Sequence, residues 1–486
     1  KYRALAAVAA WVVVLYRLWR QRRYGRVRGV QWVDGHWLLG NLPEVTKAIA
    51  ANNIHDWWVS NHKKYGKKTL AVHLPLMPTI VNTTDPKNVE HVLKINFDNY
   101  VKGDWFRERL TDLLGNGIFN VDGVMWHSQR KIASHMFTQN QFKNHIWHAI
   151  HKNCGTLMQL LHGVPEGEVV DLFNIMNRFT LDTIGSIGFA RDIGSLTNAD
   201  SPFLKSFDRA QQVSVLRFIF PFWKIQRFCG TGAEGDVKKN FKLLSDYSME
   251  TVQLLKEDPA GEKGDSFVGM FIQDAAKNGK IYDDEFLKDM VLNFLIAGRD
   301  TTAQALSWTF WLLMGHPEVE AKIVKEIKDE LGDEPITYDN SSKLKYLQNV
   351  INEGLRLYPS VPEDSKISLA DDTLPDGTFI PKGAVVQYAP YAMGRCHDLW
   401  GEDAEVFKPE RWEGRELPSS FVYTAFNAGP RECLGKRLAW VEMRACLAEV
   451  LRSVTFELAV PRDSIKQDIQ LTIGMSSGLP VRVRRR

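Results

Sequence analysis

The sequence has few cysteines, almost balanced charge and no long linker rich in glycine and serine. Only 5 of its 486 residues are cysteine and none forms a Cys-x-x-Cys pair, which argues against a disulfide framework or a zinc site and fits a reducing compartment. The formal net charge is +3, so nothing indicates a nucleic-acid partner. The length alone would allow about three domains, but no linker or internal repeat argues for a division.

Long hydrophobic runs are also missing, apart from a short one at the start of the chain. Residues 4–16 are continuously apolar, which is shorter than the roughly 20 residues of a spanning helix. Six arginines follow before residue 29, and such a basic flank stays on the cytoplasmic side. We interpret residues 1–28 as a membrane anchor. A cleaved signal peptide is the alternative, but no small-residue cleavage site follows the run and the basic flank is at the wrong end.

Periodic patterns predict both helices and short strands. Helical periodicity dominates residues 203–253 and 286–331, and we expect one long apolar helix from about Glu285 to Met314. Short extended segments that suit small β-sheets occur at residues 69–74, 79–82, 383–388 and 480–484.

The most informative segment reads Phe-x-x-Gly-x-Arg-x-Cys-x-Gly and contains Phe426, Gly429, Arg431, Cys433 and Gly435. A thiolate ligand of haem iron needs a dry pocket, backbone N–H donors and a helix N-terminus. The glycines allow close approach to a flat macrocycle, the arginine can pair with a haem propionate, and the phenylalanine can shield the sulfur. A buried structural cysteine would explain a lone Cys, but this whole pattern arises by chance in on the order of one per several million windows.

This loop resembles the haem-binding loop of the cytochrome P-450 superfamily. The resemblance implies a mainly α fold with a small β-rich lobe, a single large domain over residues 29–486 after the anchor, and a haem b with Cys433 as its iron ligand. It also implies that Glu353 and Arg356 of a Glu-x-x-Arg motif form a buried charge network with Arg411. A solvated ion pair would be the ordinary explanation of Glu-x-x-Arg alone.

Two further motifs stand in the family's order. Trp126 and Arg130 share one helix face, and the resemblance implies that both reach the haem propionates, although a surface cation–π pair would read the same way. Asp300 and Thr301 lie inside the long helix, where such residues disfavour helix and predict a widened or kinked turn. The resemblance implies that they deliver protons during oxygen activation. For this helix alone, a threonine bonded to the preceding turn and a solvated aspartate would be preferred.

Several phrases resemble the plant and fungal branch of fatty-acid and alkane ω-hydroxylases, which implies terminal hydroxylation of a long chain with O2 as co-substrate. These phrases are Phe97–Tyr100, Asp112–Asn120, Leu357–Lys366, Tyr391–Arg395 and Trp400–Ala404. The residues expected over the haem are apolar, as an alkyl chain requires: Phe119, Phe294, Ala297, Val361 and Met475. A related animal branch links a glutamate at the position of Ala297 to the haem, so we expect non-covalent haem here. Arg107 and Arg109 either pair with a substrate carboxylate or face solvent.

The resemblance also implies partners and a location. Electrons are expected from NADPH through a flavoprotein reductase, with the catalytic domain on the cytoplasmic face of the endoplasmic reticulum membrane. Lys436, Arg437 and Arg444 either form a basic docking patch or are an ordinary solvated face. A sterol, terpenoid or xenobiotic substrate stays open. So do a haem-thiolate isomerase or dehydratase and a non-catalytic haem protein, against which the intact Asp300-Thr301 pair argues.

Overall fold

The computed structural model describes residues 27–135, 145–257, 266–278 and 282–486. The expected anchor therefore lies almost wholly outside the described residues. Within the described ranges, no helix combines the length and apolar character needed to cross a membrane.

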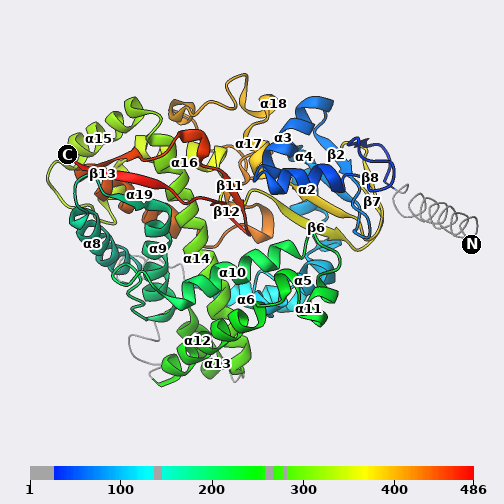
Figure 1. Cartoon of the computed structure of the whole chain (residues 1–486), viewed down its shortest axis with the longest axis horizontal. Coiled ribbons are helices and arrows are strands. Elements are labelled where there is room, and N and C mark those ends of the chain that lie inside the picture. The colour runs from blue at the N-terminus through cyan, green and yellow to red at the C-terminus, as the bar shows by residue number, and fades with distance from the viewer. Residues whose placement is uncertain (1–26, 136–144, 258–265, 279–281) are drawn as a thin grey trace, which may run out of the picture.

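Most described residues belong to helices, which surround the long central helix α14 (Figure 1). The helices are α2 (Leu42–Ala50), α3 (Ile54–Tyr65), α4 (Pro86–Glu90), α5 (Gly103–Leu114), α6 (Gly123–Ser134), α8 (Trp147–Gly163), α9 (Leu172–Phe189), α10 (Pro202–Leu216), α11 (Trp223–Cys229), α12 (Val237–Glu257), α13 (Phe267–Asn278), α14 (Asp284–Leu313), α15 (Pro317–Leu331), α16 (Lys345–Leu357), α17 (Pro390–Gly394), α18 (His397–Trp400) and α19 (Lys436–Ser453).

Helix α14 matches the long apolar helix expected from about Glu285 to Met314. Asp283 caps it by accepting a hydrogen bond from the Phe286 amide, and acidic residues in the first turn favour the same end. Apolar residues cover almost its whole circumference, because α9, α12, α16 and α19 pack around it. The polar residues inside this helix were expected to widen or kink a turn. The widened turn is absent, since residues 284–313 are α-helix without a π turn.

The strands of the described residues form four small sheets. They are β1 (Gln31–Trp32), β2 (Thr69–Val72), β3 (Ile80–Thr83), β4 (Tyr100–Val101), β5 (Val169–Asp171), β6 (Asp364–Ser368), β7 (Asp372–Thr373), β8 (Phe379–Ile380), β9 (Val385–Tyr388), β10 (Val454–Leu458), β11 (Gln467–Ile469), β12 (Ile473–Met475) and β13 (Pro480–Arg485). The largest has the order β1-β2-β3-β9-β6-β4, with β3 parallel to β9 and β6 antiparallel to β9.

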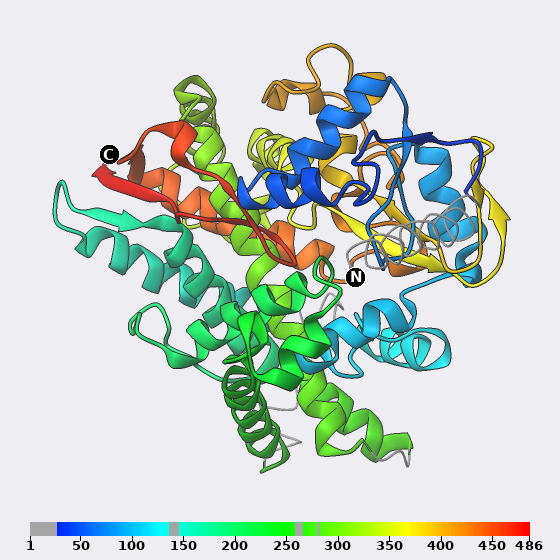
Figure 2. The same cartoon turned by 45° about the vertical axis from the view of Figure 1, so that its right-hand side comes forward.

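This six-stranded sheet lies with α2 and α3 on one side of the molecule, and the helical body occupies the other (Figure 2). The sheet β10-β13-β5 lies near the C-terminus beside α8 and α9 (Figure 1). The expectation of a mainly helical fold with small sheets is confirmed. β6 lies between β9 and β4 and also contacts α5 of the helical body.

Candidate active site

The segment from Phe426 to Gly435 forms a tight loop that ends where α19 begins. The Cys433 amide donates a hydrogen bond to the Phe426 carbonyl at 2.8 Å. Gly429 has φ +64°, and a Cβ there would lie 2.2 Å from the Leu93 carbonyl oxygen, so only glycine fits. The loop therefore holds Cys433 just before a helix N-terminus, whose free amides favour a negatively charged sulfur.

The Cys433 side chain is accessible and yet enclosed by protein. It is exposed, but burial raises the pKa of its thiol, against smaller opposite effects of the Gly435 amide and Arg130. A side chain with both properties lines an inner space. A Cβ on Gly435 would meet only the Cys433 sulfur, at 3.8 Å, so a flat group has room against this face of the loop. The Cys433 sulfur, the Gly435 amide that bonds it and the open face of the loop together fit a haem.

Trp126, Arg130 and Arg431 lie together beside this loop. The Arg431 guanidinium lies 4.5 Å from the centre of the Trp126 ring and forms an ion pair with Asp122 at 2.7 Å. Arg130, one turn along α6 from Trp126, donates to the Glu432 carbonyl at 2.5 Å. The structure thus gathers the three residues expected to reach the haem propionates.

A second group of charges in the same region was missed from the sequence. Asp364 of β6 accepts hydrogen bonds from Lys102, Lys366 and the Tyr388 hydroxyl. Tyr388 also contacts Asn427 of the cysteine loop at 2.8 Å, so this group adjoins the haem-binding segment. Burial lowers the pKa of Lys366 to about 7. Burial raises the pKa of Asp364, but the two lysines outweigh it and hold that pKa far below its usual range.

The charges of this region favour a dianionic group. Four cations stand against two carboxylates, which leaves two positive charges in excess when all are ionised; the cations are Lys102, Lys366, Arg130 and Arg431, and the carboxylates are Asp122 and Asp364. Haem b carries two propionates, so these side chains are suited to hold it. A lysine inside a mostly buried strand was the available sequence signal for Lys366, because lysine is rarely buried without a partner.

Thr301 and Asp300, the residues expected to deliver protons, lie in the middle of α14. The Thr301 hydroxyl donates to the Ala297 carbonyl at 2.6 Å, and Arg299 bonds Asp300 at 2.9 Å and Asp208 at 2.7 Å. The Thr301 bond to the preceding turn is the alternative that the sequence also allowed, whereas Asp300 is buried and not solvated.

The pairs Asp300–Arg299 and Arg299–Asp208 form a path of charged groups to the surface. The Asp300 side chain is 1% exposed, whereas that of Asp208 is 50% exposed. Burial raises the pKa of Asp300 to about 6, with Arg299 acting in the opposite direction. A carboxyl with this pKa can take up and release a proton near neutral pH.

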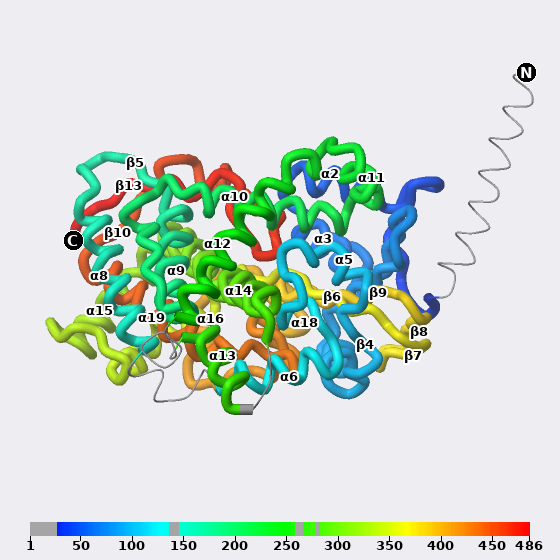
Figure 3. Tube along the Cα trace, turned by 90° about the horizontal axis from the view of Figure 1, so that it is seen from below, coloured from blue at the N-terminus to red at the C-terminus, as the bar shows by residue number. Residues whose placement is uncertain are grey.

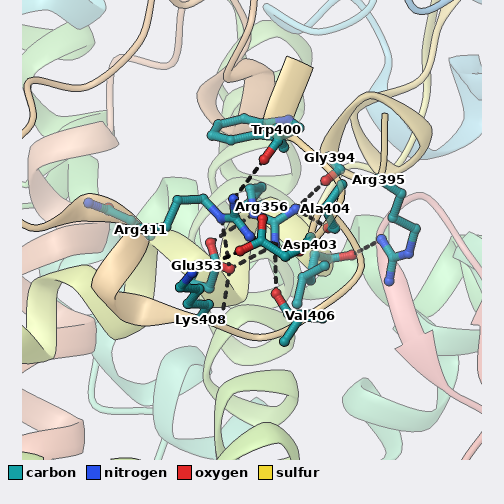
Figure 4. Close-up of polar contacts among 12 residues, drawn as sticks. Glu353, Arg356, Gly394, Arg395, Trp400, Asp403, Ala404, Val406, Lys408 and Arg411 are labelled. Atoms are coloured by element: carbon teal, nitrogen blue, oxygen red, sulfur yellow. Dashed lines mark hydrogen bonds and ion pairs between the residues drawn. The ribbon is translucent and has the colours of Figure 1, made fainter. Parts of the chain in front are cut away.

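Glu353, Arg356 and Arg411 form the expected buried network (Figure 4). Arg356 bonds Glu353 through two nitrogens, at 2.8 and 2.7 Å, and Arg411 reaches the same carboxylate at 3.4 Å. The Trp412 indole donates to Glu353 at 3.0 Å, a bond that phenylalanine could not make. Both arginines also bond backbone carbonyls between residues 394 and 406, so the network fixes this long segment.

Hydrogen bonds bring the segments of the expected substrate pocket to one face of α14. The Phe119 amide bonds Asn293 at 3.2 Å, one turn before Ala297. Ser360, next to Val361, donates to the Thr301 carbonyl at 2.6 Å. The Ile473 amide donates to the Ser360 carbonyl at 3.0 Å, which brings in β12 with Met475. Phe294 and Met475 are buried, whereas Phe119 and Val361 are partly exposed.

The structure gives partners to the basic residues whose roles the sequence left undecided. Arg109 does not face solvent, because it is buried and donates to the carbonyls of Trp105 and Arg217. Arg107 lies 4.0 Å from Asp104 at the surface. Lys436 pairs with Glu432 at 3.0 Å, Arg437 contacts Tyr338, and Arg444 donates to Gln348 at 3.3 Å.

The sequence model described as Cytochrome P450 matches residues 31–480. The chain belongs to the cytochrome P450 family. It is therefore an oxidoreductase of the monooxygenase class, which uses haem iron, O2 and electrons from a redox partner.

This P450 is similar over most of its length to several plant P450 proteins. It is 35% identical to cytochrome P450 86B1 of Arabidopsis thaliana, covering 98% of this chain and 88% of the relative. It is 35% identical to cytochrome P450 704B1 (90% and 91% covered) and 34% identical to cytochrome P450 94B1 (92% and 90% covered), both also from Arabidopsis thaliana. Its fold matches the crystal structure of the cytochrome P450DA heme domain with a TM-score of 0.82, at 23% identity, covering 94% of this chain and 98% of that one.

Glu442 of α19 is a buried acid of this P450 that sequence reasoning missed. It lies beside Thr183 and Thr302, whose hydroxyls lower its pKa, but burial outweighs them and raises that pKa to about 8. The ordinary pKa of a glutamate is 4.5. Between pH 4.5 and pH 8, Glu442 therefore keeps a proton in the folded protein that it loses in the unfolded chain.

We therefore expect the free energy of unfolding to fall as pH rises through this window. Glu442 should contribute up to about 1.4 kcal/mol per pH unit. Glu442→Gln, which cannot ionise, should flatten the slope between pH 5 and 8, as measured by urea unfolding. Glu457→Gln, at an exposed glutamate, is the matched control and should keep the wild-type slope. Equal slopes for wild type and Glu442→Gln would contradict the assignment.

Proposed function

We propose that this P450 hydroxylates the terminal carbon of a long-chain fatty acid or alkane. The observation that carries the proposal is the convergence of apolar segments on the face of α14 that holds Ala297 and Thr301. Phe119 and Val361 keep accessible surface there, although the backbone beside each is hydrogen-bonded to α14. An apolar wall with few polar anchors suits an alkyl chain.

The side chains around the site divide the work of such a reaction. When bound, haem supplies the oxidising chemistry, with O2 and two electrons. Cys433 would ligate the iron, and the cations around Asp364 and Asp122 would hold the propionates. Thr301 and Asp300 would deliver protons, and Arg299, which stays protonated, would hold the Asp300 carboxylate in place. Electrons come from NADPH through a flavoprotein reductase that docks on the side of Cys433, where α19 begins.

A binding titration on the purified, haem-loaded protein tests this function. Fatty acids and alkanes of graded length are added to the ferric form, and carbon monoxide to the reduced form. We expect the red-shifted band of a thiolate-ligated haem, and a ferric spin-state change with an optimum chain length. A thiolate band with no response to any chain would overturn the substrate proposal and favour a sterol, terpenoid or xenobiotic. Turnover of a peroxide without O2 or reductase would favour an isomerase or dehydratase.

We also propose that the protein lies on the endoplasmic reticulum membrane, with the catalytic domain on its cytoplasmic face. Exposed apolar side chains support this location: Trp37, Leu39, Leu76, Phe220, Phe222, Ile225 and Phe228. They lie near α2 and around α11, which share one face of the molecule (Figures 1 and 3). Phe228 is 92% exposed, which is unfavourable in water and favourable in lipid. A fluorophore on the exposed Cys229 should be quenched by lipid-borne quenchers in vesicles, and no quenching would count against this orientation.

A further inference from the structure

Two polar side chains of α14 hold the loop that connects α5 to α6, residues 115–122. Asp289 accepts a hydrogen bond from the Asn116 amide at 2.8 Å. Asn293, one turn later, accepts from the Phe119 amide at 3.2 Å and donates to the Leu114 carbonyl at 2.8 Å. Asp289 and Asn293 are both buried, so these bonds replace the water that each side chain loses on folding.

The two glycines of this loop fit against the same two side chains. A Cβ on Gly115 would lie 2.1 Å from the Asp289 carboxylate, and one on Gly117 would lie 1.9 Å from the Asn293 amide. Gly115 also has φ +52°, which other residues rarely adopt. The Gly-x-Gly of the loop and the Asp-x-x-x-Asn of α14 are therefore complementary in shape as well as in hydrogen bonding.

The loop is held from its other side as well. Gln129 of α6 donates to the Asn116 carbonyl at 2.8 Å, and Asn120 donates to the Gly115 carbonyl at 2.9 Å. The backbone from Leu114 to Asn120 is therefore bonded to two helices and to itself. A loop with this many buried hydrogen bonds has little freedom to move.

This arrangement places Phe119 relative to the reacting end of the pocket. Asn293, Ala297 and Thr301 are spaced four apart and share one face of α14. Each step of four residues advances about 6 Å along the helix, so Asn293 lies roughly 12 Å before Thr301. Phe119 is bonded at the level of Asn293, and its side chain is 41% exposed while its backbone is fixed.

We propose that Asp289 and Asn293 are positioning residues that fix the Phe119 ring, and thereby decide which carbon of a bound alkyl chain is oxidised. The inference rests on the proposed function, because it concerns an alkyl substrate. The ring is a wall at a set distance from Thr301. A wall that cannot move restricts how far a chain can bend or slide, and so limits reaction to its end.

The test compares the products of wild type and Asn293→Ala on one saturated fatty acid, with haem loading checked by the thiolate band. We expect the ratio of terminal to internal hydroxylation to fall at least about threefold, as for loss of one buried hydrogen bond. Amide hydrogen exchange in residues 115–120 should also become faster, which is a measurement independent of activity. Asn177→Ala is the matched control, because Asn177 is similarly buried and bonds the carbonyl four residues earlier on α9.

Phe119→Ala gives a second, sharper comparison. If Asn293 acts through the ring, the double variant should show the product ratio of Phe119→Ala alone, which is a non-additive result. If the wild type forms the terminal product and Asn293→Ala forms terminal and internal products in the wild-type ratio, this inference alone is overturned. A wild-type protein that oxidises no alkyl chain would overturn the proposed function, and this inference with it.

Discussion

Replacing Cys433 by serine should remove the thiolate signature of the haem and abolish monooxygenase activity. Cys433 is the one cysteine of the loop from Phe426 to Gly435, and that loop places its sulfur just before the N-terminus of α19. Serine keeps the shape of the side chain, but its hydroxyl does not donate charge to iron as a thiolate does. The carbon monoxide difference spectrum of the reduced protein measures the ligand, and product formation with reductase measures the activity.

Two other cysteines are matched controls for this substitution. Cys229→Ser alters an exposed residue, and Cys446→Ser alters a buried residue on α19, and both should keep the thiolate band. If Cys433→Ser keeps a normal thiolate band and normal activity, another residue ligates the iron. Haem content must be measured in every variant, so that a missing band is not mistaken for missing haem.

Replacing Arg356 by alanine should cost about 3–5 kcal/mol of folding free energy. Both Glu353 and Arg356 have fully buried side chains, and Arg356 makes two bonds to the carboxylate and others to the carbonyls of residues 394, 404 and 406. Without it, Glu353 keeps the Trp412 indole, the Lys408 amide and the more distant Arg411. The segment that Arg356 holds leads into the haem loop, so haem content should also fall. Urea unfolding measures the first effect and haem absorbance the second.

Arg356→Lys separates charge from geometry, because lysine keeps the charge but not the two-pronged bond. It should recover only a small part of the lost stability. Lys242→Ala is the control, since Lys242 pairs with Asp246 on an exposed helix face and should leave the urea midpoint nearly unchanged. A loss below about 1 kcal/mol in Arg356→Ala would mean that the network is not needed for the fold.

Local patterns predicted the elements whose signals lie within a few neighbouring residues. The bounds of α14 lie within one residue of the expected ones, because an aspartate cap and an apolar run define them. The extended segments at residues 69–74, 79–82, 383–388 and 480–484 overlap β2, β3, β9 and β13. The widened turn expected around Thr301 was wrong, because residues 284–313 stay α-helical although the Thr301 hydroxyl also bonds the Ala297 carbonyl.

The sequence by itself determined the family, the iron ligand expected at Cys433, and the pairing of Glu353 with Arg356, because each rests on residues close together in the chain. Only the tertiary structure decided the pairing of Lys102 with Asp364, the raised pKa of Glu442, and the hydrogen bonds of Asp289 and Asn293 to residues 116 and 119. These contacts join segments more than a hundred residues apart or depend on burial. Neither separation in space nor burial can be read from one sequence, since both arise when the whole chain packs.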